Sequence, residues 1–398
     1  MSDTPHTPLD NPPDTPPTSP ADSTLELRST VAGDGSVTLA VHRADVAAPA
    51  PDEVVVRVEA APINPSDLGM LFAGADMASA TGVASPSDES LPAVRAMIPT
   101  GTAGLEGRLD TAMPTGNEGG GTVVATGDSD DARALAGKVV GFLSGNAYAE
   151  YRTIKVSSCL AMNDGTDPED AAACFVNPLT ALGMVETMLD EGHRGLLHTV
   201  GASNLGLMLN RICLADGVPL VNIVRRAEHV ELLRGEGAEH VVDSSAESFV
   251  SDLTDALRAT GATIAFDAIG GGDLASVILS RMEKVASEGD QFSRYGSSTH
   301  KQVYVYGGLD RSPTILNRNF GMAWSVGGWL LTPFLMKVGP EAAERLRRRV
   351  ADEITTTFAS SYGMRLSLTD AVDPEQARRY ARMATGDKAL ITPHAADA

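Results

Sequence analysis

The run at 200–206 has the residue types and spacing best suited to holding a phosphate. It reads Val200-Gly201-Ala202-Ser203-Asn204-Leu205-Gly206 and matches G-x-G-x-x-G, with Ser203 in place of the second glycine. Gly201 would permit a tight turn, and Gly206 would let a helix pack close to its strand. The helix N-terminus would then point backbone N–H groups at a pyrophosphate. The motif predicts a dinucleotide site contacted by residues 201–205, with a glycine-rich packing turn as the alternative.

A pair of arginines follows the next expected strand. The residue ending that strand distinguishes the two nicotinamide cofactors, because an acid there hydrogen-bonds a free ribose 2′-OH whereas an arginine accommodates a 2′-phosphate. Here the strand ends in Arg225 and Arg226, and the planar donor fork of arginine suits phosphate. We therefore expect NADPH rather than NADH. The alternative is a pair of solvated surface arginines.

Two later segments, 266–271 and 305–309, each end an expected strand in glycines. Ligands bind at the carboxyl ends of strands in open α/β sheets, and glycine permits a close approach of the backbone. Simple turns are the alternative. We expect cofactor contacts from Ala268, Ile269, Gly270, Tyr306, Gly307 and Gly308.

The elements around these motifs alternate between strand and helix. Strands are expected at 195–200, 219–224, 240–243, 262–267 and 302–306, and helices at 204–215, 228–236, 247–260 and 272–285. Such alternation predicts right-handed βαβ crossovers and a doubly wound parallel sheet. A helix is expected over 340–358, and the short elements of 364–393 are expected to rejoin the first domain.

The part of the chain before this alternation is rich in expected strands. Strands are predicted at 36–41, 53–60, 121–125 and 138–142. The segment 73–114 shows no sustained period and is expected to be one long loop, a lid or an insertion. Residues 1–24 are rich in proline and aspartate, lack lysine and arginine, and are expected to form a disordered tail.

Composition narrows the class of protein. The 398 residues carry 31 Lys plus Arg against 52 Asp plus Glu, a formal charge of −21, which disfavours nucleic acid and anionic membranes as partners. No apolar run reaches the length of about 18 residues that spans a bilayer. Three cysteines without a CxxC pair favour a reducing, cytoplasmic setting.

Three further motifs, taken in order with the nucleotide segment, carry a family resemblance. They are Ala61-Pro62-Ile63-Asn64-Pro65-Ser66-Asp67, Gly116-Asn117-Glu118-Gly119-Gly120-Gly121 and Tyr148-Ala149-Glu150-Tyr151. The chain resembles the medium-chain dehydrogenase/reductase superfamily, in its zinc-free branch of quinone oxidoreductases and enoyl reductases. The resemblance implies an α/β fold with two domains and the active site between them. These are a GroES-like β-rich catalytic domain (25–165 and 345–398) and a Rossmann NADPH-binding domain (166–344), whose edge strand would form a homodimer.

The resemblance also bears on whether the chain binds zinc. Zinc-dependent relatives place a cysteine where this chain has Asn64 and a histidine where it has Asn117, and the segment 73–114 contains no cysteine or histidine for a second zinc. Zinc sites need several nitrogen or sulfur ligands, so we expect no zinc. His193 and His198 are expected to be structural.

Without a metal, a hydrogen-bond donor must stabilise the negative charge that develops on a carbonyl acceptor. Asn64 is the candidate donor, with Asp67 behind it. An ordinary helix-capping turn is the alternative. The resemblance assigns Asn177 and Thr180 to cofactor contact, against a simple helix break at Pro178.

Two tyrosine positions that supply protons in relatives are Gly69 and Ala75 here, which disfavours acyl thioester reduction. Tyr148 could replace them from the opposite side of the cleft, with simple packing of the Tyr-x-x-Tyr strand as the alternative. Asn117, Phe320 and Trp324 are expected in the substrate pocket, with a buried core helix as the alternative for the aromatic segment. The sequence thus predicts a zinc-independent NADPH-dependent reductase of small quinones or α,β-unsaturated carbonyls. The alternatives are an enoyl thioester reductase and a non-catalytic NADPH-binding structural or sensor protein.

Overall fold

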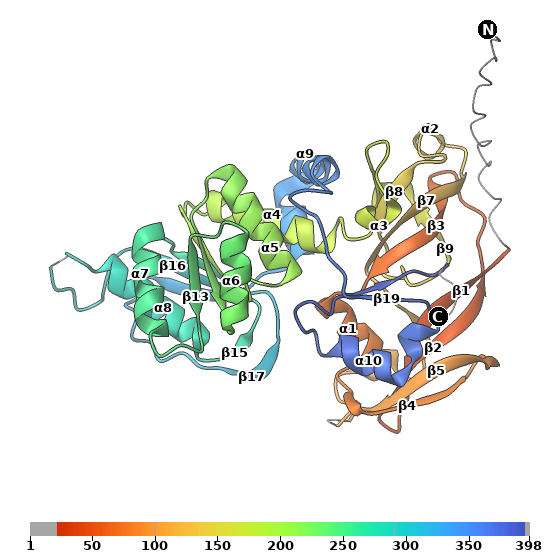
Figure 1. Ribbon diagram of the computed structural model, residues 1–398, viewed down its shortest axis with the longest axis horizontal. Coiled ribbons are helices and arrows are strands. Elements are labelled where there is room, and N and C mark those ends of the chain that lie inside the picture. Colours follow the sequence, from red (N-terminus) through yellow and green to blue (C-terminus); the bar gives the residue numbers. More distant parts are fainter. Residues whose placement is uncertain (1–21, 100, 290, 395–398) are drawn as a thin grey trace, which may run out of the picture.

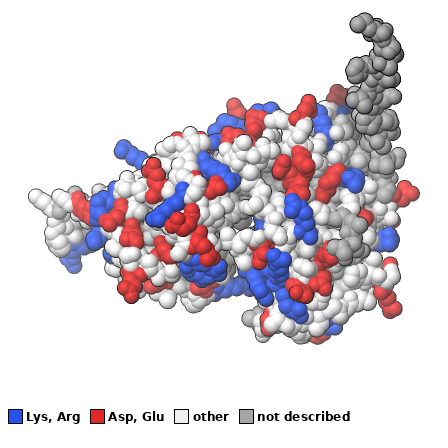
Figure 2. All heavy atoms as spheres, viewed as in Figure 1, with Lys and Arg blue, Asp and Glu red and all other residues white. Residues whose placement is uncertain are grey.

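The protein forms two lobes that lie side by side (Figure 1). The computed structural model describes residues 22–99, 101–289 and 291–394. Most of the expected tail of residues 1–24 lies outside this range, and Ser23 and Thr24 already belong to the first strand. On the face drawn in Figure 2, acidic and basic side chains are interspersed and do not form one basic patch.

The first lobe is built from two sheets. One has the order β4-β5-β2-β1-β6, and the other has the order β10-β8-β7-β3-β20-β19 with β9 also paired to β3. Branched side chains such as Leu39, Val56 and Val58 are wholly buried in its core. Its strands are β1 (Ser23–Val31), β2 (Ser36–Asp45), β3 (Glu53–Pro62), β4 (Asp76–Ser85), β5 (Asp88–Met97), β6 (Met113–Pro114), β7 (Glu118–Thr126), β8 (Val139–Leu143), β9 (Tyr151–Lys155), β10 (Cys159–Ala161), β19 (Met364–Leu366) and β20 (Ala389–Ile391).

The expectation of one long loop over 73–114 is wrong. β4 and β5 form an antiparallel hairpin, and β5 pairs with β2 from Ser36 opposite Met97 onward. Only Ala80 and Ser85 of β4 are buried, so this edge strand has no apolar alternation for a sequence pattern to reveal. Its structure comes from pairing with neighbouring strands, a tertiary effect.

The second lobe confirms the predicted alternation. Its six-stranded sheet has the order β13-β12-β11-β14-β16-β18, and every pair in it is parallel. The strands are β11 (Leu196–Thr199), β12 (Leu220–Val224), β13 (His240–Asp243), β14 (Ile264–Asp267), β16 (Lys301–Val305) and β18 (Trp324–Gly328), with a small pair β15 (Gly270–Gly272) and β17 (Asp310–Thr314). The crossover helices are α5 (Asn204–Asp216), α6 (Ala227–Gly235), α7 (Phe249–Thr260) and α8 (Leu274–Ala286).

The aromatic segment after β17 corrects two expectations. Trp324 begins the edge strand β18, so the segment is not a core helix. Phe320 is wholly buried on the face of the sheet covered by α7 and α8, and the Trp324 ring meets it edge-on at 4.9 Å. Because Phe320 is wholly buried in this core, its ring does not line a substrate pocket, and the pocket role of the half-buried Trp324 stays a prediction.

Strands from both ends of the described chain lie in the first lobe. β20 pairs antiparallel with β3, with Leu390 opposite Pro62, and parallel with β19. Leu346, Val350 and Phe358 instead pack in the core of the second lobe, so we propose that the chain returns to the first lobe after Phe358.

The remaining elements connect the lobes or cap their sheets. Helix α9 lies over the second lobe (Figure 1) and is kinked at Gly339, whose φ is 82°, immediately before Pro340. It begins earlier and ends earlier than the expected helix over 340–358. The remaining helices are α1 (Pro65–Phe72), α2 (Asp130–Arg133), α3 (Pro168–Ala171), α4 (Val176–Asp190), α9 (Leu331–Asp352) and α10 (Pro374–Ala381), with 3₁₀ turns at Glu106–Arg108, Val156–Ser158 and Asp370–Val372.

Candidate cofactor and catalytic site

The glycine turn after β11 is shaped by close approach of the backbone. Ser203 caps α5, its Oγ accepting the Gly206 N–H at 3.1 Å. A Cβ on Gly206 would lie 2.2 Å from the Gly201 carbonyl oxygen, and one on Gly201 would lie 2.8 Å from Asn222 Oδ1. Neither position has room for a side chain, which is the requirement of a turn that brings backbone N–H groups against a phosphate.

The tight turn itself falls one residue earlier than expected. Val200, not Gly201, takes the left-handed conformation, with φ at 59°. A β-branched residue is strained there, and such strain concentrates at ligand-binding turns. Asn204 Nδ2, at the first residue of α5, is buried without a hydrogen-bond partner in the described chain. A buried donor of this kind fits an acceptor such as a phosphate oxygen.

The arginine pair stands at the end of β12, beside this turn. Arg225 and Arg226 are both exposed, and Arg226 Nη1 forms an ion pair with Glu228 Oε1 at 3.2 Å. Val224 pairs with Asp243 of β13, whose carboxylate is occupied by the Ser245 N–H at 2.8 Å. Both guanidinium groups lie at the surface, and that of Arg226 is paired with Glu228.

Two glycine-bearing loops meet at the carboxyl ends of β14 and β16, as expected. A Cβ on Gly307 would lie 2.6 Å from the Ala268 carbonyl oxygen, so the two loops touch. Asp267 organises them, because its carboxylate accepts the Thr199 hydroxyl at 2.9 Å and the N–H groups of Ile269 and Gly270 at 2.9 and 3.1 Å. Sequence reasoning did not assign a role to Asp267 or Thr199.

Tyr306 turns its side chain inward, toward His198. His198 Nε2 lies 2.7 Å from the Tyr306 hydroxyl, and the two rings stack. Burial lowers the pKa of His198 to about 3, so this histidine is neutral at physiological pH. The Tyr306 side chain is thus engaged with His198, and its cofactor contact stays a prediction.

The first lobe contributes the loop that begins α1. Asn64 is the N-cap of α1, and Asp67 Oδ2 accepts the Asn64 N–H at 2.8 Å. Asp67 Oδ1 accepts the N–H of Asn117 at 3.0 Å, which ties this loop to the start of β7. Burial raises the pKa of Asp67 to about 7. Asn117 is part-exposed, with its Nδ2 3.2 Å from Ser66 Oγ.

The Asn64 side chain meets the second lobe through Glu118. Asn64 Nδ2 donates to Glu118 Oε1 at 2.8 Å, and Glu118 Oε2 accepts the N–H groups of Phe175 and Val176, where α4 begins, at 2.9 and 2.8 Å. Asn177 Nδ2 in turn lies 3.4 Å from Asn64 Oδ1. Thr180 lies nearly one turn further along α4 and is also buried. The structure therefore brings Asn64, Asn177 and the unassigned Glu118 together.

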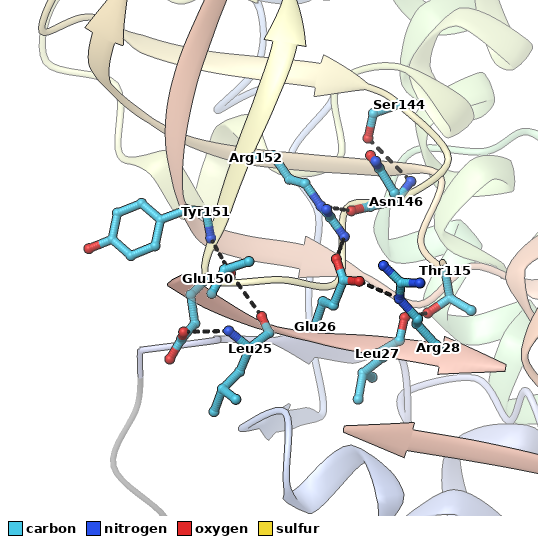
Figure 3. Close-up of polar contacts among 11 residues, drawn as sticks. Leu25, Glu26, Leu27, Arg28, Thr115, Ser144, Asn146, Glu150, Tyr151 and Arg152 are labelled. Atoms are coloured by element: carbon cyan, nitrogen blue, oxygen red, sulfur yellow. Dashed lines mark hydrogen bonds and ion pairs between the residues drawn. The ribbon is translucent and has the colours of Figure 1, made fainter. Parts of the chain in front are cut away.

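Tyr148 lies beside Asp67, and its burial favours a packing role over that of a substitute proton donor. Its side chain is wholly buried, its hydroxyl donates to the Pro62 carbonyl at 3.0 Å, and its ring packs where a Gly116 Cβ would be. Burial also raises its pKa. The chain around it is fastened to β1 (Figure 3), where Glu150 accepts the Leu25 N–H at 2.7 Å.

The contact between β1 and residues 146–152 also includes a buried cluster of ion pairs. Glu26 is wholly buried and binds both Arg28 and Arg152 (Figure 3), and Arg152 Nε also donates to the Asn146 carbonyl. Removing such a charge without its partners is costly. These contacts therefore join β1 to the chain at 146–152.

The described residues include no candidate metal-ligand cluster and no candidate membrane-spanning helix. No group of three or more His, Cys, Asp or Glu side chains in that part of the chain is placed to hold a metal ion. No described helix is both long and apolar enough to cross a bilayer.

Comparison with curated proteins finds relatives that align over part of their length. The synaptic vesicle membrane protein VAT-1 homolog of Rattus norvegicus is 28% identical over 195 residues, 48% of each chain. The quinone oxidoreductase of Pseudomonas aeruginosa is 30% identical over 161 residues, covering 39% of this chain and 48% of that protein. A mitochondrial enoyl-[acyl-carrier-protein] reductase of Caenorhabditis elegans is 28% identical over 200 residues, 49% of each. The matched part spans about half the length of these relatives, and no protein-family model matches the chain.

Solved structures match over nearly the whole chain. A Mesorhizobium loti protein assigned to the NADPH:quinone reductases superposes with a TM-score of 0.70 and 25% identity, covering 94% of this chain and all of that one. The Escherichia coli quinone oxidoreductase complexed with NADPH gives a TM-score of 0.62 at 19% identity, covering 93% of this chain and all of that one. These likenesses confirm the fold and the resemblance predicted from the order of motifs.

Proposed function

We propose that this chain, a relative of the quinone oxidoreductases and enoyl reductases with the medium-chain dehydrogenase/reductase fold, is a zinc-independent, NADPH-dependent reductase of small quinones or α,β-unsaturated carbonyl compounds. The observation that carries the proposal is the glycine turn at 201–206, closed to any side chain and followed at the next strand end by two exposed arginines.

The residues present fit a dinucleotide phosphate. Ala202, Ser203 and Leu205 would surround the pyrophosphate at the start of α5, where the buried donor Asn204 Nδ2 has no protein acceptor. Arg225 and Arg226 would hold the 2′-phosphate. The loops at 268–270 and 306–308 would border the rest of the cofactor at the sheet edge. When bound, NADPH supplies a hydride.

We assign contact with the hydride acceptor to the loop that contains Asn64. Asn64 Nδ2 carries two hydrogens, and Glu118 Oε1 accepts one of them. The second is the donor that we assign to the acceptor's carbonyl oxygen as negative charge develops there. With glycine and alanine at positions 69 and 75 and Tyr148 buried, we assign the product's proton to solvent.

Zinc independence rests on the same loop. Asn64 and Asn117 are neutral amides at the two positions where zinc-dependent relatives carry ligands. Both are engaged by protein, Asn64 with Glu118 and Asn117 with Ser66. Amide nitrogens are not zinc ligands. In this proposal the two amides form hydrogen bonds and do not bind a metal.

Two wider features belong to the proposal. We assign a homodimer to the edge strand β18, which has a sheet partner on one side in the described chain. Sedimentation of the purified protein would show a dimer if this is right and a monomer if it is wrong.

The three free cysteines, two of them buried, suit the reducing cytoplasmic setting that we propose.

The acceptor class is tested with chelator-treated protein and NADPH. Four acceptors would be compared: a benzoquinone, a phenanthrenequinone, a 2-enal and a crotonyl thioester. We expect turnover of a quinone or the enal that survives chelation. A crotonyl thioester far outpacing the others would make the chain an enoyl thioester reductase. NADPH binding without turnover of any acceptor would leave only a binding role.

A further inference from the structure

Lys388 is a buried lysine for which the proposed chemistry so far has no use. Its Nζ is buried and has no hydrogen-bond partner in the described chain. The Nζ stands 5.4 Å from the centre of the Tyr362 ring, a cation–π contact. An ammonium group without hydrogen bonds is costly to bury, so its position calls for a compensating charge nearby.

Sheet register places Lys388 beside the candidate site. Lys388 immediately precedes β20, its carbonyl accepts the Gly363 N–H at 3.0 Å, and Leu390 pairs with Pro62 of β3. The Ala389 carbonyl accepts the Ile63 N–H at 2.9 Å. One more step along this antiparallel register sets Lys388 opposite Asn64.

The compensating charge is Glu118. Glu118 and Lys388 influence each other electrostatically, each favouring the charged form of the other, and Asp67 acts on Lys388 in the same sense. Burial lowers the pKa of Lys388 to about 8 and raises that of Glu118. The titratable groups that face Lys388 or Glu118 are Asp67 on α1, Tyr148 before β9, Cys174 before α4 and Tyr362 before β19.

Glu118 needs to be ionised to make the contacts that it makes. Its two oxygens accept three N–H groups, from Asn64, Phe175 and Val176. A protonated carboxyl would turn one of these oxygens into a donor facing a donor, and a contact would be lost. An ammonium group beside Glu118 is the charge that favours the ionised form.

We propose that Lys388 is a positioning residue of the reductase, which keeps Glu118 ionised and thereby holds the Asn64 amide with its nitrogen on Glu118 and its second hydrogen toward the acceptor. The inference rests on the proposed function. No atom of Lys388 contacts the acceptor in this account, because it acts through Glu118.

The charge of Lys388 gives the account a pH signature. The ammonium form is present below the pKa of Lys388 and is lost as pH rises through about 8. Removing the ammonium group raises the pKa of Glu118, so the acidic limb of kcat, where Glu118 takes up a proton, moves to higher pH. An arginine keeps its charge throughout this range and leaves that limb where the wild type has it.

The kinetic test compares Lys388→Met, Lys388→Arg and the control Lys337→Met. Lys337 is an exposed lysine paired with Asp190 at 2.8 Å on the surface. We expect Lys388→Met to lower kcat at neutral pH at least about tenfold, because a loosened donor misplaces the acceptor. Its Kd for NADPH should stay within about twofold of wild type, since no cofactor contact is altered. Lys388→Arg should keep most of kcat and the wild-type acidic limb, whereas Lys388→Met should show that limb at higher pH, and Lys337→Met should match wild type.

An NMR titration provides a readout that does not depend on turnover. The chain has six lysines, and with ¹³C at the lysine ε-carbon the Lys388 signal is identified by its absence from Lys388→Met or, if that variant does not fold, from Lys388→Arg. We expect a midpoint near 8, moved lower by Glu118→Gln because the neighbouring anion is removed.

The outcomes separate the two proposals. A wild-type kcat profile retained in Lys388→Met, or a midpoint in the ordinary lysine range that Glu118→Gln leaves unmoved, would overturn the role of Lys388. A wild-type protein that turns over no acceptor would overturn the proposed function, while the titration would still decide whether Lys388 and Glu118 are coupled.

Discussion

The two lobes hold their parts of the site by different means. In the second lobe, Gly201 and Gly206 let backbone approach backbone or a neighbouring side chain, and no side chain fits between. In the first lobe, the arrangement depends on buried polar side chains, with Asn64 and Asp67 tied to the start of β7. The part of the site in the second lobe is therefore sensitive to added side-chain volume, and the part in the first lobe is sensitive to a change of charge.

The difference shows why the two halves tolerate change differently. A steric site fails when a single methyl group is added, whatever the pH. A network of buried ionisable groups keeps its shape while its protonation changes, and it fails when one partner loses its charge. Each of the following experiments probes one side of this contrast.

The largest effect is expected from Gly206→Ala. Its Cβ would lie 2.2 Å from the Gly201 carbonyl oxygen, so the turn must open. Overpacking costs about 3 kcal/mol, and we expect the Kd for NADPH to rise roughly a hundredfold, measured by calorimetric titration. Gly235→Ala is the matched control, because a Cβ there meets nothing within 4 Å. Unchanged affinity in Gly206→Ala would remove the steric account.

Glu118→Gln probes the network. The glutamine keeps the shape but has one acceptor oxygen for three N–H donors, and it leaves Lys388 without its anion. We expect the free energy of unfolding at neutral pH to fall by about 2 kcal/mol, measured by urea denaturation. Glu228→Gln, an exposed carboxylate paired with Arg226, should change it little. Equal midpoints for the two variants would contradict a charge-dependent first lobe.

The arginine pair is the charged component of the site in the second lobe. Arg225→Glu combined with Arg226→Glu should raise the Kd for NADPH at least about tenfold, because two cations beside a 2′-phosphate become anions. The Kd for NADH should change by less than about threefold, since it lacks that phosphate. A variant that binds both cofactors as wild type does would show that the pair is only solvated surface.

A smaller difference, in the stability of the two lobes, is expected when the pH is lowered. His198 has its pKa lowered to about 3, so the second lobe loses stability as pH falls below the unfolded value of 6.5 and the unfolded chain takes up the proton. Asp67 has its pKa raised to about 7, so the first lobe loses stability as pH rises from 3.8 toward 7. Between pH 7 and 5 we expect opposite changes of at least about 1 kcal/mol in the two lobes.

Hydrogen exchange of peptides from each lobe, corrected for the intrinsic pH dependence of exchange, measures this difference. β11 should gain exchange at pH 5 relative to pH 7, and β3 should lose it. Parallel changes in both strands would mean that these buried groups do not set the pH response.

Most of the second lobe could be predicted from sequence because its signals are local. Every expected strand and helix from 195 to 306 is present within a few residues, since periodicity and glycine turns act over short stretches. The turn at Val200 was misplaced because strain at a valine leaves no mark in the sequence. Phe320 was misplaced because burial depends on which face of the sheet its segment covers.

The first lobe was harder because its partners are distant in sequence. Asn64 was expected in the site, yet its contacts come from Glu118 and from Asn177, and Lys388 reaches it only through the pairing of β20 with β3. Glu118 stands in a motif that the sequence singled out, and an acid opening a buried glycine-rich strand is the signal that could have identified it. The exposed hairpin of β4 and β5 offers no such signal.

The most direct test of the central claim is the ratio of kcat/KM for NADPH and NADH, measured with chelator-treated wild-type protein and a benzoquinone. The glycine turn and the arginine pair predict turnover that survives chelation and favours NADPH by at least about tenfold. Equal use of the two cofactors, or activity that returns only when zinc is added, would contradict the account.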